Sequence, residues 1–280
     1  MSAIAETWFP YPTPPEILPL GRPRANYIVE HFWDRCPWKS AYSSTAKMEE
    51  TLRDFADFIP HAAADTTFLS INTLIKNSQK KPADFATLLK LAEATFYSDT
   101  VKTFSDMVYR PFAEAGSTFK KFKPDKREFY ARQLRIIDNS MLNNTVAPLS
   151  VTAADGSISH LNDTVPGVQT YILIFERPDG DHFDRVMFSA NISVNKLIEA
   201  GLIQPILICA GEPTETWWES VKRLPDGWRA VAMKNADDEM KLSHMPTVYL
   251  ADSEMKIISK FMPLDILIYN CEQLVTNAGL

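Results

Sequence analysis

Apolar residues recur at intervals of three or four through the first half of the chain. Residues 48–59 follow this spacing, and Pro60 ends the run. The same spacing returns in residues 68–75, 85–96 and 130–141, and residues 24–33 form a short aromatic-rich stretch. Such a period places the apolar side chains on one face of a helix, where another helix can bury them. The pattern predicts an all-α domain, a helical bundle, over residues 22–142.

The second half of the chain has a different pattern. Residues 171–175 form an unbroken apolar run, which is typical of a strand covered on both faces of a sheet. Asp155-Gly156 is a pair that suits a tight turn, and it predicts a hairpin over residues 149–161. Further strands are predicted at residues 205–209, 228–233, 247–251 and 256–260, and helices at residues 183–200, 216–223 and from Leu264 onward. This order predicts an α/β domain over residues 145–280, with a mixed central sheet and helices on both faces.

Composition and charge restrict the classes of function. The chain has 45% hydrophobic and 23% charged residues, the balance of a folded globular protein. Its formal net charge is −6 and its basic residues are scattered, so we expect no nucleic-acid partner, because that partner needs a basic surface. No apolar run is long enough to span a membrane. The five histidines lack the spacing of metal ligands, and we expect neither a metal nor a cofactor.

The cysteines show no redox motif. Cys36, Cys209 and Cys271 are far apart and form no C-x-x-C pair. An odd number leaves at least one thiol free within the chain, and free cysteines are usually buried. We therefore expect buried thiols with no catalytic role.

The first 21 residues are poor in charge and rich in proline. They lack the basic start and the apolar core of a signal peptide. Two interpretations follow from residues 1–21: a cytoplasmic protein, or an envelope protein whose targeting segment lies outside this sequence.

Several motifs in residues 145–280 resemble those of thioredoxin-like proteins, and in particular the TlpA-like thiol-disulfide oxidoreductases. The loop Pro178-Asp179-Gly180-Asp181-His182-Phe183 follows the first apolar strand and is similar to the P-x-C-x-x-C loop of that family. In this alignment Gly180 stands where the nucleophilic cysteine would be, and Phe183 stands where the resolving cysteine would be. Met245-Pro246 resembles the family's cis-proline loop, and residues 251–258 resemble its next hairpin. The resemblance implies that Pro246 faces the degenerate redox loop.

The first half resembles a second group of proteins. Arg24-Ala25-Asn26-Tyr27 and His31-Phe32-Trp33-Asp34 are similar to the start of envelope proteins from anaerobic bacteria. Those proteins carry an uncharacterised helical domain before a thioredoxin-like domain, and they are typically secreted or lipid-anchored. The resemblance implies a periplasmic or outer-envelope location.

The missing cysteines exclude the family's ordinary chemistry. Thioredoxin chemistry needs a thiolate at a helix N-terminus, where the helix dipole lowers the thiol pKa, and a second thiol one turn later. Gly180 has no side chain and Phe183 has no nucleophile. We therefore expect no dithiol oxidoreductase activity.

Three hypotheses about function follow. The first is a non-catalytic protein that binds an extended polypeptide, or another envelope protein, at a groove lined by residues 178–183, Met245 and Pro246; strand addition to the backbone before Pro246 needs no catalytic side chain. The second is an enzyme with a metal or acid–base site rebuilt on Asp181, His182 and His244; the simpler interpretation of the acidic residues is that Asp179 or Asp181 caps the helix. The third is an oligomerising scaffold that acts through its helical domain. Trp217 and Trp218 serve either as groove contacts or as core residues.

Overall fold

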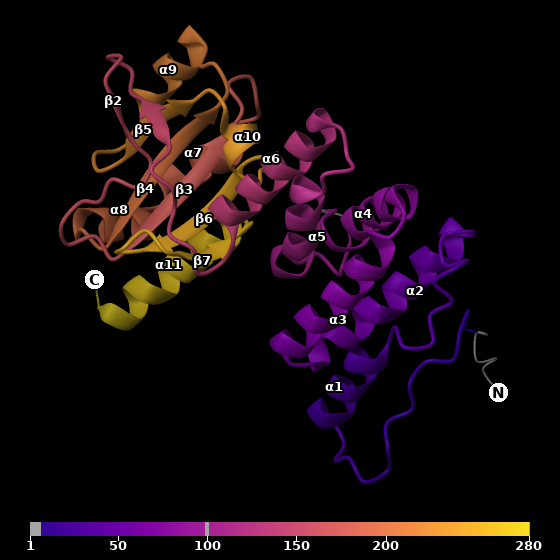
Figure 1. Cartoon of the computed structure of the whole chain (residues 1–280). Helices are drawn as coiled ribbons and strands as arrows, with labels where there is room; N and C mark the ends of the chain where they lie inside the picture. The colour runs from indigo at the N-terminus through magenta and orange to yellow at the C-terminus, as the bar shows by residue number, and fades with distance from the viewer. Residues whose placement is uncertain (1–6, 99–100, 280) are drawn as a thin grey trace. The chain divides into compact units, whose positions relative to one another are not determined.

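The computed structural model describes residues 7–98 and 101–279. The described chain divides into two compact units, and the division falls between Leu134 and Arg135, inside α6 (Figure 1). The first unit is helical and the second contains the sheet, as the sequence predicts. None of the helices described here has both the length and the apolar character that a bilayer span requires.

The helical unit contains the bundle that the periodicity predicts. Its helices are α1 (Arg22–His31), α2 (Thr45–Phe58), the short 3-10 turn η1 (Ile59–His61), α3 (Ala64–Ser78), α4 (Pro82–Phe96), α5 (Asp106–Thr118) and α6 (Pro124–Ser140). Aromatic side chains fill much of the core, and Phe32, Trp33 and Phe55 are almost completely buried in mutual contact. Ser44 begins α2 because its hydroxyl accepts a hydrogen bond from the Lys47 backbone N–H.

The proline-rich segment before α1 packs on this unit. Phe9 is buried, and its ring centroid lies 6.2 Å from that of Phe32 and 6.5 Å from that of Trp33. The Tyr11 hydroxyl donates a 2.6 Å hydrogen bond to a carboxylate oxygen of Asp54 in α2. Sequence analysis sets residues 1–21 apart from the bundle, yet Phe9 and Tyr11 are bound to it. Residues 1–6 of that segment lie outside the described residues.

Helix α5 was not predicted. It contains Pro111, which removes a backbone hydrogen bond and usually disfavours a helix interior. Val108, Tyr109, Phe112 and Ala113 are nevertheless buried at helical spacing, so packing outweighs the proline.

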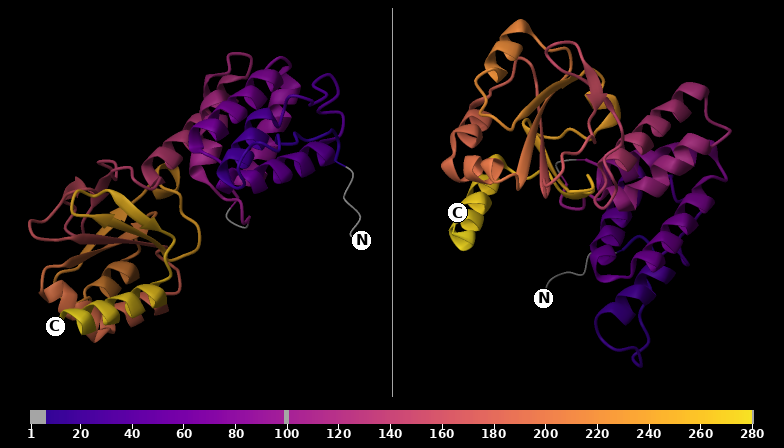
Figure 2. Two further views of the ribbon diagram at one scale, coloured as in Figure 1. Left: turned by 90° about the horizontal axis from the view of Figure 1, so that it is seen from below. Right: turned by 90° about the vertical axis from the view of Figure 1, so that its left-hand side faces the viewer.

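The second unit is built on a seven-stranded mixed sheet with the strand order β2-β1-β5-β4-β3-β6-β7 (Figure 2). The strands are β1 (Ser150–Thr152), β2 (Ile158–His160), β3 (Thr170–Glu176), β4 (Ile203–Ala210), β5 (Arg229–Met233), β6 (Thr247–Asp252) and β7 (Ile257–Lys260). Strands β3, β4 and β5 are parallel, whereas β6 is antiparallel to β3 and to β7. The hairpin β1–β2 turns at Asp155-Gly156 as predicted, and Gly156 has the positive φ that such turns require.

Helices cover both faces of this sheet. Helices α7 (Phe183–Ala190), α8 (Ile192–Glu199) and α11 (Leu264–Ala278) share one core with the sheet, and α9 (Glu215–Val221) contributes Trp217 to it. The short helix α10 (Ala236–Glu239) packs on the opposite face. The left view of Figure 2 shows α11, in yellow, along one side of the sheet. The fold is therefore the predicted mixed sheet with helices on both faces.

One predicted helix is wrong. Residues 183–200 were expected to form one continuous helix, but the structure breaks it between α7 and α8 at Asn191. Asn191 has an extended backbone, and its side-chain oxygen accepts a 3.1 Å hydrogen bond from the Val194 N–H. Asparagine is a strong N-cap residue, so it ends one helix and begins the next.

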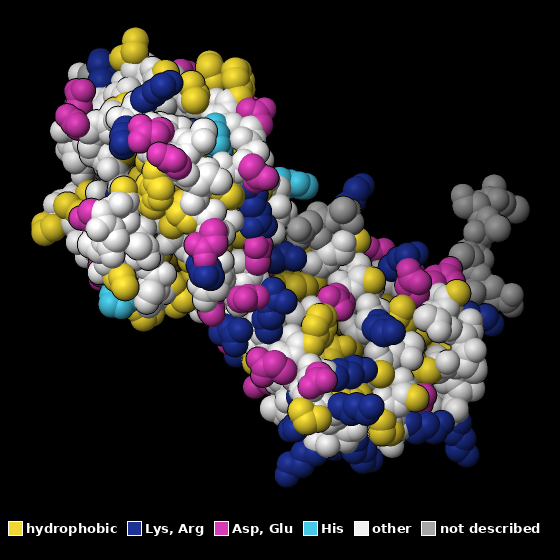
Figure 3. Space-filling view, turned by 90° about the horizontal axis from the view of Figure 1, so that it is seen from above, with side chains coloured by type: hydrophobic (Ala, Val, Ile, Leu, Met, Phe, Trp, Pro, Cys, Tyr) yellow, Lys and Arg dark blue, Asp and Glu magenta, His cyan; other side chains and the backbone are white. Residues whose placement is uncertain are grey.

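Figure 3 shows one face of each unit, on which basic, acidic and apolar side chains are all present. On the helical unit, Lys and Arg side chains gather toward the lower edge of this view.

Candidate functional site

The sheet brings the loop of residues 178–183, which follows β3, to the same end of the sheet as the Met245–Pro246 segment. Strand β3 ends at Glu176, and the antiparallel strand β6 begins at Thr247, which pairs with Phe175. The segment that leaves β3 and the segment that enters β6 therefore meet at one edge of the sheet. The Met245–Pro246 peptide bond in the entering segment is cis.

Arg177 fixes the start of the degenerate loop. Its guanidinium donates two 2.7 Å hydrogen bonds to the two carboxylate oxygens of Asp237, and a third, of 3.1 Å, to the Ala210 carbonyl. The hydrogen bond to Asp237 raises the pKa of Arg177. Further along, the Gly180 N–H donates to the Arg177 carbonyl at 3.2 Å. The loop is thus closed by its own backbone and attached to α10.

The start of α7 has an acidic partner, as predicted. A carboxylate oxygen of Asp181 accepts a 2.9 Å hydrogen bond from the Phe183 N–H. His182 occupies the N-cap position itself, and its side chain makes no capping hydrogen bond. Asp179 is exposed on the loop.

A buried ionic cluster lies at the base of the loop, where β3 ends. Glu176 is 3% exposed and Arg185, in the first turn of α7, is 4% exposed. One Glu176 oxygen accepts a 2.5 Å hydrogen bond from the Trp217 indole and lies 3.3 Å from the Arg185 guanidinium. The other oxygen lies 3.2 Å from Nδ1 of His182. Arg185 also reaches the Ser220 hydroxyl at 3.2 Å.

Sequence analysis missed this cluster. Its signal is Glu176 itself, because an acidic residue directly ends an otherwise apolar strand. The cluster also explains Trp217, which is buried in the core and is not a groove contact. A buried carboxylate with a cation and an indole donor beside it has its hydrogen-bonding capacity largely satisfied. We therefore interpret the cluster as the structural base of the loop.

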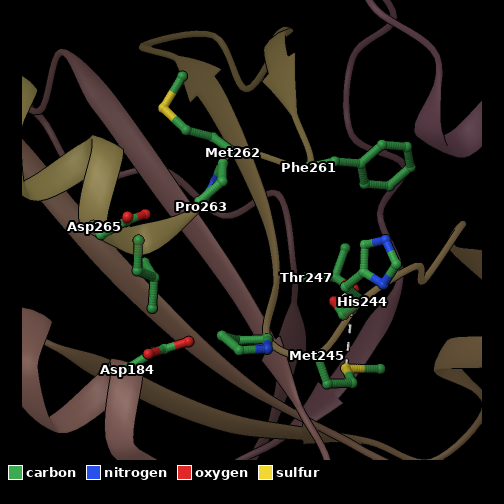
Figure 4. Close-up of a pocket in the computed structure, with 10 residues that line it drawn as sticks. Asp184, His244, Met245, Thr247, Phe261, Met262, Pro263 and Asp265 are labelled. Atoms are coloured by element: carbon green, nitrogen blue, oxygen red, sulfur yellow. Dashed lines mark hydrogen bonds between the residues drawn. The ribbon is translucent and has the colours of Figure 1, made fainter. Parts of the chain in front are cut away.

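A pocket of about 370 Å³ lies beside the proline loop (Figure 4). Its walls combine the proline loop, the start of α7 and the segment that joins β7 to α11: Asp184, His244, Met245, Pro246, Thr247, Phe261, Met262, Pro263, Leu264 and Asp265. Figure 4 shows Asp184 and Asp265 on one side of it and His244 and Phe261 on the other. The pocket contains Met245 and Pro246 from the predicted groove, whereas residues 178–183 do not line it.

The backbone of Met245 is available to a ligand. Within residues 7–98 and 101–279, neither its N–H nor its C=O makes a hydrogen bond. The preceding residue is engaged, because the Thr247 hydroxyl donates a 2.6 Å hydrogen bond to the His244 carbonyl. Met245 thus offers one donor and one acceptor next to the pocket.

The three residues of the hypothetical rebuilt site occupy two places. His182 contacts Glu176, and Asp181 contacts the start of α7, whereas His244 lines the pocket. In the part of the chain that the structure describes, no group of His, Cys, Asp and Glu side chains is arranged to hold a metal ion. The pocket is lined by His244 and, on its other side, by Asp184 from the first turn of α7.

The cysteines are free and buried, as expected. Burial raises the pKa of Cys36 and of Cys209 to about 12, and that of Cys271 to about 11. A thiol with so high a pKa is protonated near neutral pH and is a poor nucleophile.

Comparison with known proteins finds a family model, for the first half of the chain, and a solved structure that is similar over both units. The family model described as a domain of unknown function, DUF5106, matches residues 2–140. A thioredoxin-like protein from Bacteroides caccae matches 95% of the chain and 98% of its own length, with a TM-score of 0.74 and 18% identity. No protein with a curated description matches the chain.

Two other solved structures match only about half of the chain. A conserved protein of unknown function from Bacteroides fragilis covers 47% of the chain and 98% of its own length, at 21% identity and a TM-score of 0.41. The thioredoxin domain of a thiol-disulfide oxidoreductase from Bacteroides vulgatus covers 48% of the chain and 97% of its own length, at 16% identity and a TM-score of 0.39. Residues 2–140 are thus similar to DUF5106, and the chain has the fold of a thioredoxin-like protein.

Proposed function

We propose that this protein is a non-catalytic thioredoxin-like protein that binds an extended polypeptide at the pocket beside Met245 and Pro246. The observation that carries the proposal is the free backbone of Met245 at the edge of that pocket. An extended chain that pairs with this N–H and C=O gains main-chain hydrogen bonds, while the pocket accepts one of its side chains.

The chemistry of the loop supports a role without catalysis. Gly180 and Phe183 stand where the family's two cysteines would be, and neither can attack a disulfide. The three thiols are buried with raised pKa values, so they do not replace the missing pair. Binding, in contrast, needs only the backbone and the pocket.

Fluorescence anisotropy with a labelled, permanently unfolded polypeptide tests this function. Reduced and carbamidomethylated ribonuclease A is a suitable probe, because its chain is extended and its thiols are blocked. We expect saturable binding to the wild-type protein. Met245→Pro removes the backbone N–H and should weaken binding about tenfold or more, since a lost hydrogen bond in an interface carries about 1–2 kcal/mol.

Met245→Ala is the matched control, because it shortens the side chain and keeps the N–H. It should retain most of the affinity, and circular dichroism should show that both variants are folded. Equal binding by Met245→Pro and the wild type would refute the role of this backbone, and no binding by the wild type would refute the function.

We also propose an envelope location. The support is the likeness of residues 24–34 to envelope proteins, which sequence analysis identifies. Fractionation of cells that express the tagged natural gene product tests it: recovery in the periplasmic or membrane fraction is expected, and recovery in the cytoplasmic fraction would overturn the proposal.

A further inference from the structure

The residues in and around the proposed groove also indicate which side chains it favours in a polypeptide ligand. We propose, on the basis of the function above, that it selects a polypeptide segment in which a Lys or Arg side chain is flanked by apolar residues. The cationic side chain enters the pocket between Asp184 and Asp265, and the apolar neighbours lie on the exposed flanks of α7 and α11.

The charge of the pocket supports a cationic side chain. Two carboxylates line it together with the imidazole of His244, and none of the described residues that line it is Lys or Arg. Among the residues that the structure describes, neither Asp184 nor Asp265 forms a salt bridge. Asp265 accepts only the 2.8 Å hydrogen bond of the neighbouring Ile266 N–H. Lys260 directs its ammonium group to the Phe261 ring, 5.1 Å from the ring centroid.

The walls and the rim of the pocket support apolar neighbours. Pro246, Met262 and Leu264 line it with apolar atoms. On the adjoining helices, large apolar side chains are exposed to solvent: Phe183 (64%) and Met187 (51%) on α7, and Ile266 (49%) and Tyr269 (59%) on α11. Exposed apolar groups that adjoin a pocket typically mark an interaction site.

Helix geometry makes the pocket and these apolar side chains one surface. Helices α7 and α11 pack against each other. Residues three or four apart share a helix flank, so Met187 lies beside Asp184 and Tyr269 lies beside Asp265. An extended chain that starts at Met245 therefore meets the two carboxylates first and the apolar side chains next.

Each carboxylate also has a local role, because it lies in the first turn of its helix, where negative charge is favourable. That role affects stability alone and makes no distinction between ligands. A comparison of peptides that differ in a single charge separates the two roles.

The experiment uses three labelled peptides that differ only in their central residue, which is Lys, Leu or Glu, with apolar residues on both sides. Anisotropy is measured with the full chain at low and at high salt. The wild type should bind the Lys peptide about tenfold more tightly than the Leu peptide, and the Glu peptide most weakly, because two partly exposed ion pairs together give an effect of this order. High salt should reduce the advantage of Lys.

The variant Asp184→Asn/Asp265→Asn should lose most of the preference for Lys and keep its affinity for the Leu peptide. Asp179→Asn is the matched control, because Asp179 is an exposed carboxylate of the loop that does not line the pocket. Asparagine keeps the size of the side chain, and thermal unfolding shows whether the variant is folded.

The outcomes separate this inference from the function on which it rests. Equal binding of all three peptides by the wild type, or an unchanged preference in the double variant, would overturn the cationic selection and leave polypeptide binding intact. Failure of all three peptides and of unfolded ribonuclease A to bind would overturn both.

Discussion

Each unit contains a buried polar contact, and the two contacts differ in charge. In the helical unit, the Tyr109 hydroxyl donates to Gln133 at 2.7 Å, and the Gln133 amide donates to Glu93 at 2.7 Å. The contact between Tyr109 and Gln133 joins two neutral groups. In the thioredoxin-like unit, Glu176 and Arg185 are both almost fully buried and face each other.

This difference indicates where each unit tolerates change. A buried charge depends on its partner, because an unpaired ion in a protein interior is strongly unfavourable, whereas a neutral group loses much less. In the thioredoxin-like unit, substitutions should therefore lower the free energy of unfolding most at Glu176 and Arg185, and least in the loop of residues 178–183. In the helical unit, they should lower it most where two helices approach closely.

The largest effect is expected at the ionic cluster. Glu176→Ala leaves Arg185 charged and unpaired and removes the acceptor of the Trp217 indole, so we expect a loss of about 3–5 kcal/mol in the free energy of unfolding. Urea denaturation followed by circular dichroism measures it. Glu176→Gln keeps an acceptor for Trp217 and should be less damaging. A loss below about 1 kcal/mol for Glu176→Ala would show that the cluster does not support the unit.

The second-largest effect on the free energy of unfolding is expected at Gly116, where α5 approaches α6. A Cβ atom at Gly116 in α5 would lie 2.6 Å from the Tyr130 ring. Replacing glycine by alanine inside a helix ordinarily stabilises it by about 1 kcal/mol. Here Gly116→Ala should instead destabilise the protein by about 1–3 kcal/mol, because it overpacks the interface.

The double variant Gly116→Ala/Tyr130→Leu sharpens this prediction. Removing the ring makes room for the new methyl group, so the two substitutions should be non-additive in the same denaturation experiment. Additive losses would mean that the contact with Tyr130 is not the cause.

A smaller effect is expected for the neutral contact between Tyr109 and Gln133. Tyr109→Phe leaves the Gln133 oxygen without its donor and should lower the free energy of unfolding by about 1–2 kcal/mol. Tyr109→Phe/Gln133→Leu removes both partners and should recover part of the loss. If Tyr109→Phe were as damaging as Glu176→Ala, the contrast between the two units would be wrong.

The smallest effect on stability is expected at the loop. A Cβ atom at Gly180 would lie 3.4 Å from the Arg177 carbonyl oxygen, an ordinary contact, and Phe183 is largely exposed. Gly180→Cys/Phe183→Cys should therefore change stability by no more than about 0.5 kcal/mol.

The same variant should gain dithiol oxidoreductase activity, which we do not expect of the wild type. In an insulin-reduction turbidity assay with dithiothreitol, we expect only background from the wild type and clear reduction by the double variant. Activity of the wild type above background would mean that Cys36, Cys209 or Cys271 is reactive despite its burial. An inert double variant would mean that the loop alignment is wrong.

Periodicity was sufficient to predict the fold class. The unbroken apolar run of residues 171–175 and the hairpin at Asp155-Gly156 correspond to β3 and to β1–β2. Two predictions of helices failed because a single residue contradicts the apolar pattern around it. One helix was missed, and another was predicted as continuous although it is divided. Pro111 concealed α5, although its buried face has helical spacing, and Asn191 divides a segment whose apolar pattern is continuous.

The candidate site was only partly predictable. Met245 and Pro246 could be found because they resemble the cis-proline loop of thioredoxin-like proteins, and the structure places both at the pocket. Asp265 and Phe261 could not be found, because they join the site through the return of the chain from β7 into α11, and that proximity depends on the sheet register. The partners of Glu176 could not be found either, because they lie up to 41 positions away in the sequence and only the folded chain brings them together.

The burial of Phe9 has a consequence for anyone who shortens this chain. A recombinant fragment that starts at the first helix would keep Phe32 and Trp33 but lack the ring that lies against them. It would also lack the hydroxyl that binds Asp54. Such a fragment would expose an aromatic surface to water and is expected to aggregate, so the sensible starting point for an isolated helical domain lies before Phe9.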